Sequence, residues 1–112
     1  MKPIISFEDF TKVDLRIGTI LEVNDFPKAR KPAYQLIIDF GALGFKNSSA
    51  QITTLYSKEE LIGKQVSAVV NFEPRQIANF SSEVLVLGIQ NGADVILLQS
   101  ATPQIKNGEQ IT

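Results

Sequence analysis

The sequence contains no cysteine, no histidine and no tryptophan among its 112 residues. Without histidine the commonest general base is missing, and with it the Ser–His type of nucleophile activation. The usual zinc and copper ligands are also missing. The acidic residues show no metal-binding spacing, and there is no glycine-rich phosphate loop. These absences favour a binding protein without metal or cofactor over an enzyme.

Long hydrophobic runs are also missing. No stretch approaches the ~20 apolar residues that span a bilayer, and the N-terminal MKPIISFEDF lacks the apolar core of a signal peptide. The sequence therefore predicts a cytoplasmic protein without membrane insertion. A chain of 112 residues that is 44% hydrophobic and 21% charged is typical of one globular domain, which we expect to cover residues 1–112.

Positive charge is concentrated in one part of a chain whose net charge is −1. Residues 26–46 contain Lys28, Arg30, Lys31 and Lys46 against a single acid, Asp39. Such a basic island can contact phosphates or an acidic partner, and it can equally be a solvated loop.

Two short helices are predicted from their capping residues. Ser6 can cap a helix in which Asp9 occupies the third position, a weaker form of the capping box. Ser57 can cap a second helix, with Glu60 at the third position and Gly63 as its C-terminal stop.

Short strands account for most of the remaining sequence. From Val13 the residues alternate, which predicts a half-buried strand with Ile17 on one face and Gly18 on the other. Further strands are expected in residues 34–41, 64–72, 83–88 and 95–99, with a turn at Asn91–Asp94. Residues 41–53 are expected to form a turn followed by the third strand. The pattern predicts an all-β protein with short helices. Its fold is expected to be an OB-fold, a five-stranded Greek-key β-barrel, with an N-terminal helix and extra C-terminal strands.

The third strand is unusually polar. If Ala50 and Ile52 face the core, the period of two turns the residues between and after them outward. This row is either a hydrogen-bonding ligand surface or a polar solvent face. The candidate ligand-binding residues on this segment are Lys46, Ser49, Gln51 and Thr53.

A polar stretch, NFEPRQIANFSSE, separates the apolar run before it from VLVLG. Pro74 cannot donate to a strand ladder, so we expect a connection here. Arg75 in it can bind a phosphate or carboxylate, or can pair with Glu83. Apolar Phe72, Ile77 and Phe80 can contact a ligand or seal the barrel end.

The stretch from residue 7 to residue 112 contains, in this order, the segments VDLRIGTI, IDFG, SSAQIT, QVSAVVNFEPRQIANFSSEVLVLG and VILLQ. Together they resemble the CsaA family of small bacterial protein-export chaperones, part of a wider group of OB-fold tRNA-binding domains. The wider group has a similar segment, N-L-x-P-R-x-[IM]-x-x-x-x-S-E-G-M-L-L. The residues carried over from that pattern to the candidate site are Asn71, Arg75, Ser82 and Glu83. The chain departs from it at Val84–Leu85, which replaces Gly-Met.

The resemblance implies a homodimer, with the apolar N-terminal residues Ile4, Ile5 and Phe7 as expected contacts. It also implies an ATP-independent chaperone that binds unfolded or precursor polypeptides, in apolar and preferably basic segments, and assists export. The export ATPase SecA is a further expected partner. The alternative is binding of structured RNA such as tRNA, with Arg75 and the basic island contacting phosphates.

Overall fold

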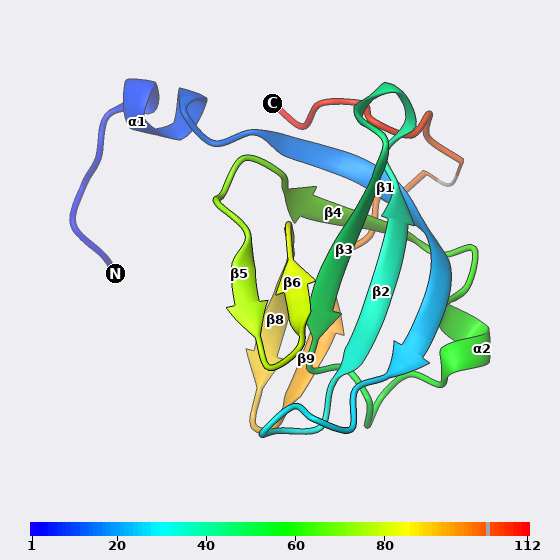
Figure 1. Ribbon diagram of the computed structural model, residues 1–112. Coiled ribbons are helices and arrows are strands. Elements are labelled where there is room, and N and C mark those ends of the chain that lie inside the picture. Colours follow the sequence, from blue (N-terminus) through cyan, green and yellow to red (C-terminus); the bar gives the residue numbers. More distant parts are fainter. Residues whose placement is uncertain (103) are drawn as a thin grey trace.

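The computed structural model describes residues 1–102 and 104–112. Most of its regular structure is β-strand, as predicted, with two short α-helices and one 3₁₀ turn (Figure 1). In chain order the elements are α1 (Phe7–Thr11), β1 (Leu15–Asp25), β2 (Tyr34–Asp39), η1 (Gly41–Leu43), β3 (Phe45–Ala50), α2 (Lys58–Leu61), β4 (Gln65–Val69), β5 (Arg75–Ile77), β6 (Phe80–Ser82), β7 (Leu85–Val86), β8 (Gly88–Asn91) and β9 (Asp94–Leu97).

Five antiparallel strands, in the order β3-β2-β1-β4-β7, curve into a nearly closed barrel of the OB type. The long strand β1 serves two partners: residues 15–19 pair with β4, and residues 19–25 pair with β2. The register shifts between Ile20 and Glu22, and a bulge of this kind bends a strand. The predicted OB-fold is confirmed.

Both faces of β1 are covered near its middle, so the half-buried strand expected there is wrong. Gly18 faces the barrel core, where Ile38 and Phe40 occupy the space that a side chain would need: an added Cβ would lie 2.6 Å from Ile38 Cγ2 and 2.7 Å from Phe40 Cε1. Ile17, on the opposite face, is also buried. Its N–H donates to Glu109 O at 3.1 Å, so the C-terminal segment lies along the outer edge of this strand.

The stretch predicted as a connection is partly regular structure. Arg75 opens β5, which pairs with β6 in a short hairpin and places Arg75 opposite Ser82. The strand expected over residues 83–88 is divided into β7, which belongs to the barrel, and β8, which pairs with β9 outside it. β7 pairs with β4 through Val86 opposite Ala68 and Leu85 opposite Val69, and the chain then leaves the barrel to form the β8–β9 hairpin.

Both predicted capping boxes are present, at Ser6 with Asp9 and at Ser57 with Glu60. Gly63 follows the second helix with φ +87°, a conformation that suits glycine. Helix α1 has no buried residue and reaches away from the barrel (Figure 1). Within the described residues, no helix is long and apolar enough to cross a membrane.

Candidate ligand-binding groove

A groove of about 570 Å³ brings together residues from three separate parts of the sequence. The loop between β1 and β2, the end of β3 and the β5–β6 hairpin form its walls. The residues that line it include Arg30, Lys31, Ser49, Gln51, Arg75 and Ile77. We call this the basic groove. Some of the predicted site residues therefore meet in one place: Arg30 and Lys31 from the loop, Ser49 and Gln51 from the polar third segment, and Arg75 from the polar stretch.

An adjoining recess of about 290 Å³ continues the groove toward the β8–β9 hairpin. Lys31 and Gln51 line both hollows, which makes them contiguous, and Thr53 lies in the recess. The hairpin turn contributes Gly92 and Ala93. The sequence had indicated that turn but gave no sign that its residues border a site.

Three cationic side chains, Arg30, Lys31 and Arg75, line the basic groove, and no carboxylate lines it among the described residues. Ser49 and Gln51 add uncharged hydrogen-bonding groups between them, and Ile77 adds an apolar contact. Positive charge focused in a hollow attracts anions. The groove therefore has the chemistry to bind anions such as the phosphates of a nucleic acid or the carboxylates of a polypeptide.

The edge of β3 that faces residues 82–84 is held by a mixture of side-chain and backbone hydrogen bonds instead of a regular ladder. Glu83 Oε1 accepts from the N–H of Asn47 at 3.0 Å, and Ser82 Oγ accepts from the N–H of Ser49 at 3.0 Å. In the opposite direction, the N–H of Glu83 donates to Asn47 O at 2.8 Å. Ser82 and Glu83, predicted as ligand contacts, therefore have their acceptor oxygens engaged in closing the barrel and positioning the groove wall.

Arg75 and Glu83 form no ion pair in the described part of the chain. Arg75 is exposed at the groove, and Glu83 turns toward β3. The alternative in which Arg75 pairs with Glu83 is therefore not what the structure shows.

Asn71 connects the end of β4 to the segment that enters β1. Its Oδ1 accepts from the N–H of Asp14 at 2.9 Å, and its Nδ2 donates to Lys12 O at 2.8 Å. Since both ends of this amide bond to backbone, Asn71 fastens the chain at this corner and does not line the groove.

Two cations from the predicted set lie outside the groove. Lys46 is near the start of β3, and Lys28 is exposed on the same loop as Arg30.

The apolar residues of the polar stretch differ in their packing. Phe72 is 56% exposed and does not seal the barrel end, whereas Phe80 packs edge-on against Phe26, with 5.4 Å between the ring centroids. Of the two residues that depart from the tRNA-binding pattern, Val84 is buried in the core and Leu85 is 50% exposed, and neither lines the basic groove.

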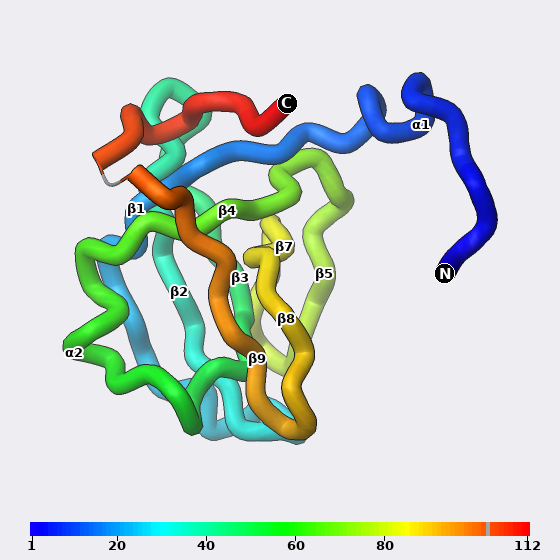
Figure 2. Tube along the Cα trace, turned by 180° about the vertical axis from the view of Figure 1, so that it is seen from behind, coloured from blue at the N-terminus to red at the C-terminus, as the bar shows by residue number. Residues whose placement is uncertain are grey.

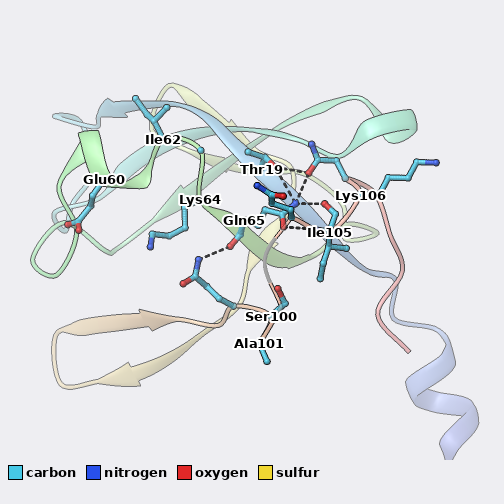
Figure 3. A pocket seen from close by; sticks show the side chains of 13 residues that line it. Thr19, Glu60, Ile62, Lys64, Gln65, Ser100, Ala101, Ile105 and Lys106 are labelled. Carbon is cyan, nitrogen blue, oxygen red and sulfur yellow. Dashed lines mark hydrogen bonds between the residues drawn. The ribbon is translucent and has the colours of Figure 1, made fainter.

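A larger hollow, of about 810 Å³, lies between the end of α2 and the C-terminal segment (Figure 3). Gln65 is its central polar group: Oε1 accepts from the N–H of Ile105 at 2.9 Å, and Nε2 donates to Asn107 Oδ1 at 3.2 Å. These bonds join the C-terminal segment to β4. None of the predicted site residues lies here, and we interpret this hollow as the seam between that segment and the barrel.

A charge interaction outside the basic groove joins α2 to the end of β1. Lys58 Nζ donates to Asp25 Oδ2 at 3.0 Å, and this hydrogen bond raises the pKa of Lys58. Neither residue lines the basic groove. Among the described residues, no group of three or more acidic side chains is placed to hold a metal ion.

Comparison with known proteins gives consistent matches. A family model described as "Putative tRNA binding domain" matches residues 15–110. The structure of the chaperone CsaA from Bacillus anthracis is 52% identical with a TM-score of 0.93, over 98% of this chain and 100% of that one. The CsaA chaperone protein from Picrophilus torridus is 54% identical with a TM-score of 0.89, over 97% of this chain and 100% of that one.

Longer proteins match as well. The methionine–tRNA ligase of Phocaeicola vulgatus is 36% identical over 114 aligned residues, covering 99% of this chain but only 16% of the ligase. The chain thus corresponds to a small part of that enzyme. A MetRS-related protein from Pyrococcus horikoshii, 20% identical with a TM-score of 0.85 over 99% of this chain and 100% of that one, shares the fold.

Proposed function

This chain belongs to the tRNA-binding-domain family and, within it, to the CsaA proteins, and we propose that it is an ATP-independent chaperone that holds unfolded or precursor polypeptides in the cytoplasm and assists their export. The observation that carries this proposal is the similarity, at 52–54% identity over 97–98% of the chain, to two proteins described as CsaA chaperones. In this role the protein binds and releases and catalyses no reaction. The export ATPase SecA is the proposed recipient of the precursors.

The basic groove has the chemistry to hold an extended polypeptide. Ser49 and Gln51 can exchange hydrogen bonds with the backbone of an unfolded segment, and Ile77 offers it an apolar contact. Arg30 and Arg75 can bind its carboxylates. Such contacts form and break reversibly without nucleotide hydrolysis. The charge of the groove selects acidic segments among the unfolded chains.

A second candidate function is tRNA binding. The observation that favours it is the convergence of Arg30, Lys31 and Arg75 in a hollow whose described lining contains no carboxylate. An OB-fold offers this face to nucleic acids, and phosphate contacts supply most of such affinity. With three cations, we expect this binding to be weak and sensitive to salt.

A paired titration tests both functions. A fluorescently labelled, reduced and carboxymethylated lactalbumin serves as a permanently unfolded polypeptide, and unfractionated tRNA serves as the nucleic acid. The chaperone function predicts saturable binding of the polypeptide that Arg75→Ala weakens. Lys28→Ala is the matched control, because Lys28 is exposed on the groove loop but does not line the groove. Saturable binding of tRNA with no binding of the polypeptide would replace the first function by the second.

A further inference from the structure

The outer edge of β8 carries backbone groups that have no partner in the described part of the chain. The N–H of Leu98 donates to Leu87 O at 3.4 Å, which marks a hydrogen-bonded pair at the base of the β8–β9 hairpin. Bonded and non-bonded pairs alternate along antiparallel strands, so Gly88 and Gln90 point their N–H and C=O groups away from β9. No described residue bonds to these groups, and all of β8 is exposed.

The outer edge of β9, in contrast, is attached to the barrel. The N–H of Leu97 points away from β8 and donates to Tyr56 Oη at 3.1 Å, while the Leu97 side chain is buried in the core. Figure 2 shows β9 on the side of the hairpin nearer to α2 and β8 on the side away from it. β9 therefore fastens the hairpin, and β8 is the edge that another chain can reach.

This edge lacks the features that usually prevent pairing. Exposed edge strands are commonly protected by a charge, a proline or a bulge. β8 has the sequence GIQN and a regular register with β9, so it has none of these. The hairpin β5–β6 differs, because Pro74 precedes β5 and Arg75 opens it. The edge of β3 is closed by Ser82 and Glu83. β8 is thus left open to an additional strand.

A polypeptide backbone is the partner that suits this edge. Gly88 and Gln90 each offer a donor and an acceptor on the same side, and an extended peptide returns one of each at the matching spacing. A phosphate group accepts hydrogen bonds and donates none, so the phosphates of a nucleic acid would leave the C=O groups of β8 unpaired. An additional strand would also stabilise the hairpin, because two strands alone are only marginally stable in water.

The open edge leads into the recess beside the basic groove. Gln90, Gly92 and Ala93 line that recess, which shares Lys31 and Gln51 with the groove. Figures 1 and 2 both place the tip of the hairpin beside the loop between β1 and β2. A polypeptide paired along β8 can therefore continue past the tip toward the cations of the groove.

We propose that β8 captures an extended segment of an unfolded polypeptide as an additional strand, and that acidic residues next to the paired stretch bind in the basic groove. Ile89 is 54% exposed on β8, so an apolar side chain of the added strand would pack beside it. The inference rests on the proposed chaperone function and names the class of segment: apolar and extended, with acidic residues at its end.

Labelled synthetic peptides test the mode of binding. The parent peptide alternates valine and threonine and carries three aspartates at each end. Strand addition uses the amides of one edge only, so N-methylation of all valine amides or of all threonine amides should have unequal effects. One pattern should weaken binding at least about 5-fold, since each lost hydrogen bond contributes about 2- to 12-fold, and the other should not. Replacing the aspartates by lysines should weaken binding at least about 10-fold, because the groove is cationic.

A matched pair of variants tests the edge itself. Gln90→Pro removes one outward N–H from β8, and proline is tolerated at such edge positions. It should weaken binding of the parent peptide about 2- to 12-fold. Gln76→Pro is the control, because Gln76 also lies at a non-bonded position of a hairpin with a two-residue turn but does not line the groove. It should leave peptide affinity unchanged, with urea unfolding to confirm that both variants fold.

The outcomes separate this inference from the function on which it rests. Equal effects of the two methylation patterns would overturn strand addition, and a lysine peptide that binds as well as the parent would overturn the acidic preference. A parent peptide that fails to bind while unfolded lactalbumin binds would reject the inference and leave the chaperone function standing. If neither binds, both are wrong. If Gln90→Pro lowers the mass in light scattering without changing peptide affinity, the edge belongs to a second copy and the inference fails.

Discussion

Asn47 and Glu83 exchange two hydrogen bonds where the barrel closes. The N–H of Glu83 donates to Asn47 O at 2.8 Å, and the N–H of Asn47 donates to Glu83 Oε1 at 3.0 Å. A regular ladder would use a backbone carbonyl for the second bond, whereas here a carboxylate supplies it. Since an unpaired backbone N–H in a buried edge costs free energy, the polar Ser82–Glu83 step lets the chain change direction without leaving β3 unsatisfied.

Removing the carboxylate of Glu83 should destabilise the fold. Glu83→Ala leaves the Asn47 N–H without its acceptor, which we expect to lower the free energy of unfolding by about 1–3 kcal/mol. Glu83→Gln should retain most of the stability, because the amide oxygen also accepts. Urea unfolding measures this, with the exposed neighbour Ser81→Ala as control. An unchanged midpoint for Glu83→Ala would show that the bond does not matter to closure.

Arg75 should act on binding and not on stability. It is exposed and has no ion-pair partner in the described residues, so Arg75→Ala should change the free energy of unfolding by no more than ~0.5 kcal/mol. The loss of a charge-assisted contact should weaken ligand binding by ~1.5–3 kcal/mol. Arg75→Lys should restore ligand affinity only partly, because the ammonium group of lysine is a point charge and lacks the planar fork of donors of the guanidinium group.

The measurement for Arg75 is a pair of curves for each variant, urea unfolding and binding to unfolded polypeptide or tRNA. A shifted midpoint with unchanged affinity would contradict the assignment. The ligand contact would then be sought on the part of the groove formed by Ser49 and Gln51.

The salt dependence of tRNA binding should be modest. Three cations line the basic groove, and each phosphate contact contributes about 0.7–0.9 to the slope of log K against log salt. We therefore expect a slope of about −2 to −3, measured by titration between 50 and 200 mM salt. A slope near −8 would mean that a far larger basic surface meets the RNA.

Gly18 should not tolerate a side chain. A Cβ there would meet Ile38 Cγ2 at 2.6 Å and Phe40 Cε1 at 2.7 Å. Gly18→Ala is therefore expected to lower the free energy of unfolding by about 1–3 kcal/mol through overpacking. In an Ile38→Ala background the cost should fall, because the clashing methyl group is gone. Equal costs in both backgrounds would rule out this contact as the cause.

The sequence by itself determined the elements whose signals are local. Ser6 with Asp9 and Ser57 with Glu60 fixed the helix starts, because a capping box involves residues only three apart. The period-two pattern and the turns gave the barrel strands and the OB-fold. Arg30, Lys31, Ser49, Gln51 and Arg75 were likewise identified as candidates from residue type.

Only the tertiary structure decided what each polar residue does, because that depends on partners distant in sequence. Ser82 and Glu83 bond to β3, more than thirty residues away, and Asn71 bonds to the entrance of β1. The same long-range packing placed Gly18 against Phe40 and paired the backbone of Ile17 with the C-terminal segment. No local pattern encodes these contacts, so residue type alone could not separate side chains that close the barrel from those that line its groove.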